Sequence, residues 1–72
     1  MAPENKPSAE GVRLRRRRSK LGLTQEELAR RVGVTTHTIW RLENLPLFNP
    51  RIGTLQAIAK ALGVSVSYFL RT

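Results

Sequence analysis

The chain has 72 residues, no cysteine and a net charge of +8, with 13 Lys and Arg against five Asp and Glu. This length allows one small domain, and the lack of cysteine excludes disulfides and thiolate metal sites. The sequence has no apolar run of about 18 residues that could span a membrane and no signal-peptide pattern, so we expect a cytoplasmic, nucleoid-associated protein. Its positive charge favours a polyanion as partner over an acidic protein or an anionic membrane.

The N-terminal region divides into a polar segment and a basic helix. Residues 1–8 contain two prolines and no apolar periodicity, so they are expected to form a flexible arm or a leftover segment without a role. The folded domain is therefore predicted to cover residues 9–72. Its first helix is predicted to run from about Ala9 to Leu21, because Gly22 suits the left-handed position just beyond a helix end.

Two short helices follow with a tight turn between them. Thr24 and Glu27 have the spacing of a capping box, which predicts a second helix over about Gln25–Val32. Gly33 permits the positive φ of a turn, and a third helix is expected over about Thr36–Asn44.

The remainder is predicted to be a loop and two further helices. Residues 45–50 contain two prolines and are expected to be a loop. Apolar residues at helical spacing predict a fourth helix over about Ile52–Leu62, which ends at Gly63. Ser65 is expected to cap a last helix over about Val66–Leu70.

The second and third helices have the pattern of a helix-turn-helix. Ala29 is small where the two helices must approach each other, and Gly33 follows at the bend. Ile39 and Leu42 are spaced to pack beneath the first helix. An ordinary helical hairpin is the alternative, but the short turn favours the steep crossing of the DNA-binding motif.

Several segments in this order resemble the lambda-repressor-like family, also called the Cro or XRE type. They are Leu21–Ala29, Gly33–Thr35, Ile39–Asn44 and Ala59–Ser65, within a resemblance that covers about residues 11–71. The resemblance implies an all-α, compact five-helix domain with its third helix in the DNA major groove. It also implies a homodimer on a pseudo-palindromic operator in double-stranded DNA.

Helical periodicity gives the third helix a candidate base-reading face. If Thr38, Ile39 and Leu42 point inward, the opposite stripe is Thr36, His37, Trp40, Arg41 and Asn44. Arg41 can bond guanine bidentately, and Thr36 can contact a thymine methyl or a base edge. His37 can donate or accept, or be merely solvated. Trp40 is expected to cover thymine methyls or sugars, or else to fold over the aliphatic part of Arg41.

Phosphate contacts are expected from residues around this helix. Gln25 lies in the first turn of the second helix, where backbone N–H groups favour an anion. In the family a matching glutamine bonds a phosphate and steadies a side chain of the third helix. The resemblance also assigns backbone contacts to Asn44 and Arg51. Solvated side chains are the alternative for all three.

The basic run in the first helix surrounds its whole circumference. Leu14 and Leu21 mark the core side, and Arg18 lies on it. A buried arginine needs a carboxylate, and Glu43 is the best candidate; the family commonly has an ion pair at these two positions. Arg13, Arg16, Arg17 and Lys20 are left for DNA phosphates or solvent, although the family commonly has leucine at the position of Arg17.

Apolar residues of the loop and of the last helix exceed what so small a core can bury. We expect them to form a twofold dimer interface or, alternatively, a lid over the fourth and fifth helices. The interface candidates are Leu45, Leu47, Phe48, Tyr68 and Phe69.

The predicted function is a transcriptional regulator, with repression as the expected action. One histidine and no cysteine leave no catalytic triad, and we expect no enzyme activity, cofactor, metal or small-molecule ligand. A protein-interaction module on the same fold, with Trp40, Phe48 and Tyr68 as anchors, is one alternative. A DNA-binding antitoxin and a cationic bundle for RNA or membranes are others.

Overall fold

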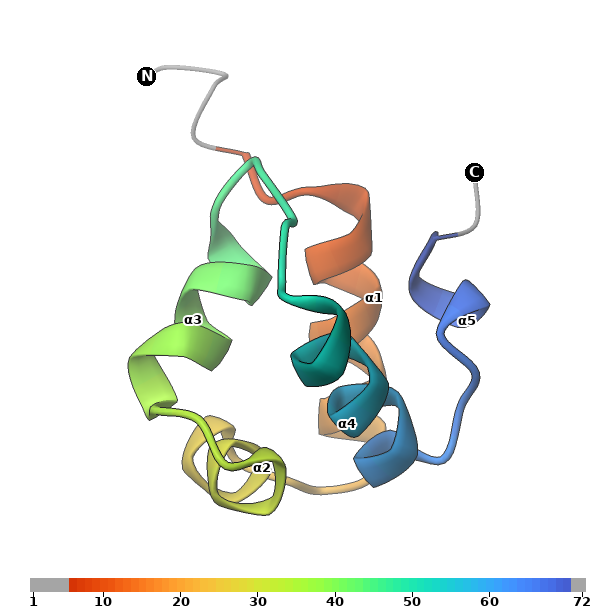
Figure 1. Cartoon of the computed structure of the whole chain (residues 1–72). Helices are drawn as coiled ribbons and strands as arrows, with labels where there is room; N and C mark the ends of the chain where they lie inside the picture. Colours follow the sequence, from red (N-terminus) through yellow and green to blue (C-terminus); the bar gives the residue numbers. More distant parts are fainter. Residues whose placement is uncertain (1–5, 71–72) are drawn as a thin grey trace.

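The computed structural model describes residues 6–70, which form five helices and no strand. The helices are α1 (Ala9–Lys20), α2 (Gln25–Val32), α3 (Thr36–Asn44), α4 (Ile52–Leu62) and α5 (Ser67–Leu70). In Figure 1, α3 and α5 lie on opposite flanks of the molecule, with α1 and α4 between them and α2 near one end. The all-α five-helix prediction is confirmed. None of the described helices is long and apolar enough to cross a membrane.

Local signals set the bounds of the two central helices. The Thr24 hydroxyl accepts from the Glu27 backbone at 3.0 Å, and the Glu27 carboxylate accepts from the Thr24 backbone at 2.8 Å. This reciprocal capping box starts α2. Gly33 ends it at φ 87°, a backbone conformation that glycine adopts without steric cost. The Thr35 side chain then accepts from Thr38 N and starts α3.

The apolar core takes side chains from all five helices. Its buried members are Leu14, Leu28, Ala29, Ile39, Leu42, Leu55, Ile58, Ala59, Leu62 and Phe69. Leu21 was expected on the core side of α1, but 44% of it is exposed. It lies beyond the end of the helix, where ψ is 0°, so the spacing of seven from Leu14 no longer places it on the same face.

A glycine lets α1 and α3 approach each other closely. A Cβ at Gly11 would lie 2.3 Å from the Leu42 carbonyl oxygen and 3.2 Å from the Cα of Glu43. Both neighbours are backbone atoms, which cannot turn aside as a flexible side chain can. Gly11 therefore sets the distance between α1 and the helix that carries the candidate site.

The folded domain begins at Ser8, one residue before the predicted boundary. Ser8 is 9% exposed, its hydroxyl accepts from Gly11 N at 2.8 Å, and its own N–H donates to Leu45 O at 3.0 Å. The assignment of Ser8 to a flexible arm is therefore wrong, because its side chain caps α1 and its backbone pairs with the end of α3. Residues 1–5 of the expected arm lie outside the described residues.

Candidate nucleic-acid interface

The outer face of α3 forms an exposed ridge, which we define as Thr36, His37, Trp40 and Arg41. Behind it, Ile39 is fully buried and Leu42 is 7% exposed. These two anchors fix the rotation of α3, so the four ridge side chains stand away from the core. Thr38 was expected to point inward, but it is only half-buried, and its hydroxyl lies 3.0 Å from that of Thr35, the N-cap of α3.

Two aromatic rings stack on this ridge. His37 and Trp40 lie one helical turn apart, with ring centroids 5.9 Å apart and ring planes inclined by 8°. Trp40 is 44% exposed. The stack on His37 is a contact of the indole that the sequence did not predict. The rings therefore give the ridge a flat apolar surface beside its polar groups.

A buried carboxylate holds the ridge in place relative to α1 and α2. Glu43 accepts from Arg18 Nε at 2.6 Å and from Arg18 Nη2 at 3.0 Å, and its side chain has no exposed area. Arg18 also donates to Leu23 O at 2.7 Å. Arg18 and Glu43 thus form the buried ion pair that the sequence predicts. Because the acid of α3 is buried and paired, the outer face of α3 carries no negative charge.

Gln25 joins the same network from the first turn of α2. Its Nε2 donates to Glu43 Oε1 at 3.0 Å, which leaves the second amide hydrogen for another acceptor. The side chain is half-buried, so its orientation is fixed before any ligand arrives. This geometry suits a donor to a phosphate oxygen at the edge of the ridge.

Asn44 ends α3 with one of its donors in use. Its Nδ2 donates to the Trp40 backbone oxygen at 2.9 Å, and the residue is half-buried. The bond closes the last turn of the helix beneath the aromatic stack. Asn44 therefore supports the ridge, and its second amide hydrogen is the group that could reach a phosphate.

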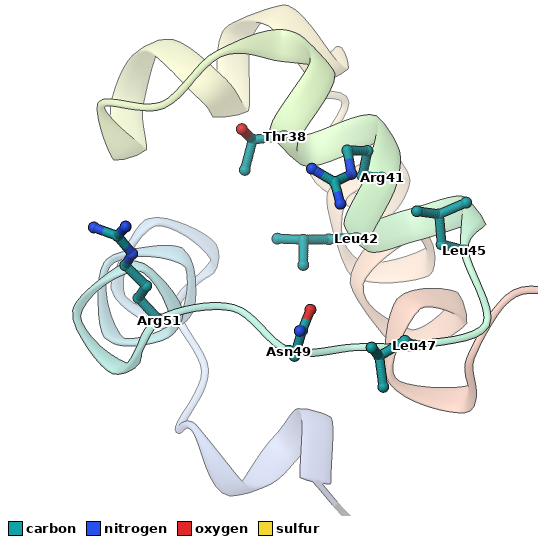
Figure 2. Close-up of a pocket in the computed structure, with 7 residues that line it drawn as sticks. All are labelled: Thr38, Arg41, Leu42, Leu45, Leu47, Asn49 and Arg51. Atoms are coloured by element: carbon teal, nitrogen blue, oxygen red, sulfur yellow. The ribbon is translucent and has the colours of Figure 1, made fainter.

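A pocket of about 400 Å³ opens between α3 and the segment that leads to α4, as Figure 2 shows. Its lining consists of Thr38, Arg41, Leu42, Leu45, Leu47, Asn49 and Arg51. Arg41 extends from α3 and Arg51 from the cap of α4, on opposite sides of the opening (Figure 2). Neither forms an ion pair within residues 6–70. The pocket is thus flanked by positive charge, and Leu42, Leu45 and Leu47 form the apolar part of its lining.

The cations of α1 do not all face solvent. Arg16 is exposed, as expected, whereas Arg17 donates through Nε to Leu62 O, 2.9 Å away at the end of α4. Arg13 similarly donates to Phe69 O at 2.8 Å. Each arginine pairs with a carbonyl in the last turn of a helix, where positive charge is favourable. Arg13 and Arg17 thus have structural contacts that were not expected, and the role of Arg17 as a phosphate contact stays a prediction.

The candidate dimer residues divide into buried and exposed groups. Phe69 has no exposed area, so its expected place in a dimer interface is wrong. Phe48 is half-buried with its ring 6.5 Å from that of Phe69, and Tyr68 contacts Phe69 edge-on at 5.2 Å. Phe48 and Tyr68 thus pack against the core, which favours the alternative of a lid for these two residues. Leu45 is half-buried, and Leu47 remains 66% exposed.

Known proteins share both the sequence pattern and this arrangement. A family model described as helix-turn-helix matches residues 14–69. An uncharacterized HTH-type transcriptional regulator of Methanothermobacter thermautotrophicus is 52% identical over 50 residues, which are 69% of this chain and 71% of the relative.

Two solved structures extend the likeness to the fold. The P22 c2 repressor in complex with a synthetic operator is 36% identical, with a TM-score of 0.82, and the match covers 89% of this chain and 96% of that one. SinR, a master regulator for biofilm formation solved in complex with DNA, is 31% identical, with a TM-score of 0.79 and coverages of 85% and 97%. With the family model matching residues 14–69 and the same fold in both structures, the chain belongs to the lambda-repressor-like helix-turn-helix family.

Proposed function

We propose that this protein is a sequence-specific regulator of transcription that binds double-stranded DNA and acts as a repressor. The observation that carries the proposal is the α3 ridge, which is exposed, rigidly supported and free of acidic side chains. The major groove of B-form DNA is wide enough to admit an α-helix, and the base edges there differ in their hydrogen-bond donors and acceptors. The P22 c2 repressor and SinR, both solved with DNA, have the same fold, which supports the proposal.

The ridge residues would read bases, and the residues around them would hold the backbone. Arg41 suits guanine, since its guanidinium can bond O6 and N7 together, and Thr36 and His37 offer smaller hydrogen-bonding groups. Phosphates would be bound by Gln25, Asn44, Arg51 and Arg16. Gln25 is the best prepared of these, because Glu43 already orients its amide at the positive end of α2. The protein would then act in the cytoplasm on the nucleoid.

The two roles predict different mutant behaviour. After selection of bound duplexes from a random pool, Arg41→Ala should relax the preference at one base pair and cost about 1–3 kcal/mol on the selected sequence alone. Gln25→Ala should weaken selected and random duplexes equally. Arg30→Ala removes the same charge as Arg41→Ala but lies outside α3, and it should leave the base preference intact. Equal losses of Arg41→Ala on selected and random duplexes would remove Arg41 from base reading.

Salt dependence separates DNA binding from a protein-interaction module on the same fold. Each phosphate neutralised should steepen the dependence of log affinity on log salt by about 0.9. A protein-interaction module would bind its partner with little salt dependence, and duplex DNA would not compete.

We also propose that the protein binds its operator as a homodimer. Leu47 supports this, because it is an apolar side chain that is 66% exposed in the segment between α3 and α4. A twofold dimer would place two α3 ridges about 34 Å apart, one turn of DNA, on a pseudo-palindromic site. Sedimentation equilibrium tests this: Leu47→Ser should shift the protein toward monomer, whereas an unchanged association would exclude Leu47 from the interface.

A further inference from the structure

The stack of His37 and Trp40 gives the α3 ridge a surface with little polar character. The two rings are nearly parallel, at 8°, and the indole is 44% exposed. An indole has a single polar group, the Nε1–H donor, so most of what it presents to a partner is apolar area. Base edges are mostly polar, and a large apolar ring on a base-reading face therefore needs an apolar group opposite it.

The indole is also held in place before DNA is present. Ile39, next to it in the chain, is fully buried and fixes the rotation of the helix. The Trp40 carbonyl accepts from Asn44 Nδ2 at 2.9 Å, which ties the helical turn beneath the ring. The His37 ring stacks on the indole and limits its rotation. Such a preset surface loses little conformational entropy on binding and can discriminate by shape.

The major groove offers one apolar group among the base edges, the methyl at C5 of thymine. Cytosine, adenine and guanine present only donors, acceptors and C–H edges there, whereas 5-methylcytosine carries the same methyl as thymine. We propose that the stack of His37 and Trp40 selects a 5-methylpyrimidine, either thymine or 5-methylcytosine, at one position of the recognised sequence. The inference rests on the proposed function, because it assigns a base class to part of the α3 ridge.

Replacing single methyl groups in the DNA tests this selection. In the duplex selected from a random pool, each thymine is replaced in turn by deoxyuridine, which removes the methyl and keeps every hydrogen-bonding group. Burial of one methyl corresponds to about fourfold in affinity. We expect a loss of about this size at one thymine of each bound site, and 5-methylcytosine placed there should bind better than cytosine by a similar factor.

Variants show whether the stack is responsible. Trp40→Gln should remove the preference for thymine over uracil, and His37→Ala should reduce it, because the indole then loses its stacking partner. Arg41→Ala should lower affinity but retain the thymine-to-uracil ratio. The melting temperature of Trp40→Gln should remain close to wild type, because Trp40 lies outside the core, and this separates base selection from a structural role.

The outcomes distinguish this inference from the function beneath it. A wild-type protein that binds the thymine and uracil forms equally at every position would overturn the inference and leave sequence-specific DNA binding standing. A Trp40→Gln variant that keeps the wild-type ratio of affinities for the thymine and uracil duplexes would also overturn the inference. If the random pool yields no preferred sequence, the proposed function fails and the inference fails with it.

Discussion

Removal of Arg18 should destabilise the fold far more than its partial exposure suggests. Arg18→Met keeps much of the side-chain length and removes the charge that faces the Glu43 carboxylate. That carboxylate has no exposed area and accepts two hydrogen bonds from Arg18, at 2.6 and 3.0 Å. After the substitution only the amide of Gln25 remains to compensate a buried negative charge.

The expected loss is large relative to the stability of so small a domain. Breaking a buried ion pair by removing one partner costs about 3–5 kcal/mol. A chain of 72 residues, at about 0.05–0.15 kcal/mol per residue, has a free energy of unfolding of about 4–11 kcal/mol. Arg18→Met should therefore unfold much of the protein in mild denaturant. Adding Glu43→Leu should recover most of the loss, because the unpaired buried charge is then gone.

Urea unfolding followed by circular dichroism measures this directly. The wild type, both single variants and the double variant form a double-mutant cycle, and we expect a strong non-additive term between the two sites. The exposed pair of Arg30 and Glu26, 3.9 Å apart, is the matched control, and its removal should change the midpoint little. Additive losses at Arg18 and Glu43 would refute the reasoning, since the ion pair would then not be the interaction that holds α1 to α3.

Three further substitutions probe the fold. Gly11→Ala should cost about 1–3 kcal/mol, because its Cβ would meet the Leu42 carbonyl at 2.3 Å; an unchanged urea midpoint would mean that α1 and α3 separate freely. Gly53→Ala should raise stability by about 0.5 kcal/mol, since nothing lies within 4 Å of the new Cβ, and a loss in thermal unfolding would contradict this. The backbone and side-chain hydrogen bonds with Thr24 hold the pKa of Glu27 below its usual value of 4.5. A carboxylate whose pKa is lower in the folded state than in the unfolded state stabilises the fold at pH values above its unfolded-state pKa, and this stabilisation is lost as pH falls through its folded-state pKa. Glu27→Gln should therefore lower the free energy of unfolding at neutral pH and make the loss of stability in acid less steep. If the stability of Glu27→Gln depends on pH as that of the wild type does, the capping box is not the source of the stability lost in acid.

Signals confined to a few neighbouring residues made the central helices predictable. Thr24 and Gly33 fix the two ends of α2, and Thr35 fixes the start of α3, by local hydrogen bonds and φ that do not depend on the rest of the fold. The spacing of Ile39 and Leu42 likewise fixed the inward face of α3, and with it the ridge.

Long-range contacts were the part that the sequence could not show. Arg13 and Arg17 lie within a run of similar cations, and only the folded chain brings the carbonyls of Phe69 and Leu62 to them. Phe69 was predicted to be exposed because the sequence does not show that α5 packs against α1 and buries it. Ser8 alone had a local signal that was overlooked, because a serine directly before a predicted helix is a common N-cap.

Chemical-shift perturbation by the selected duplex is the most direct test that the α3 ridge enters DNA. The largest shifts should occur in the backbone amides of Thr36, His37 and Arg41 and in the indole Nε1–H of Trp40. Smaller shifts are expected for Gln25 and Arg51, which would contact the DNA phosphates. Shifts confined to the exposed face of α1 or to α5, with the α3 ridge unchanged, would contradict this mode of binding.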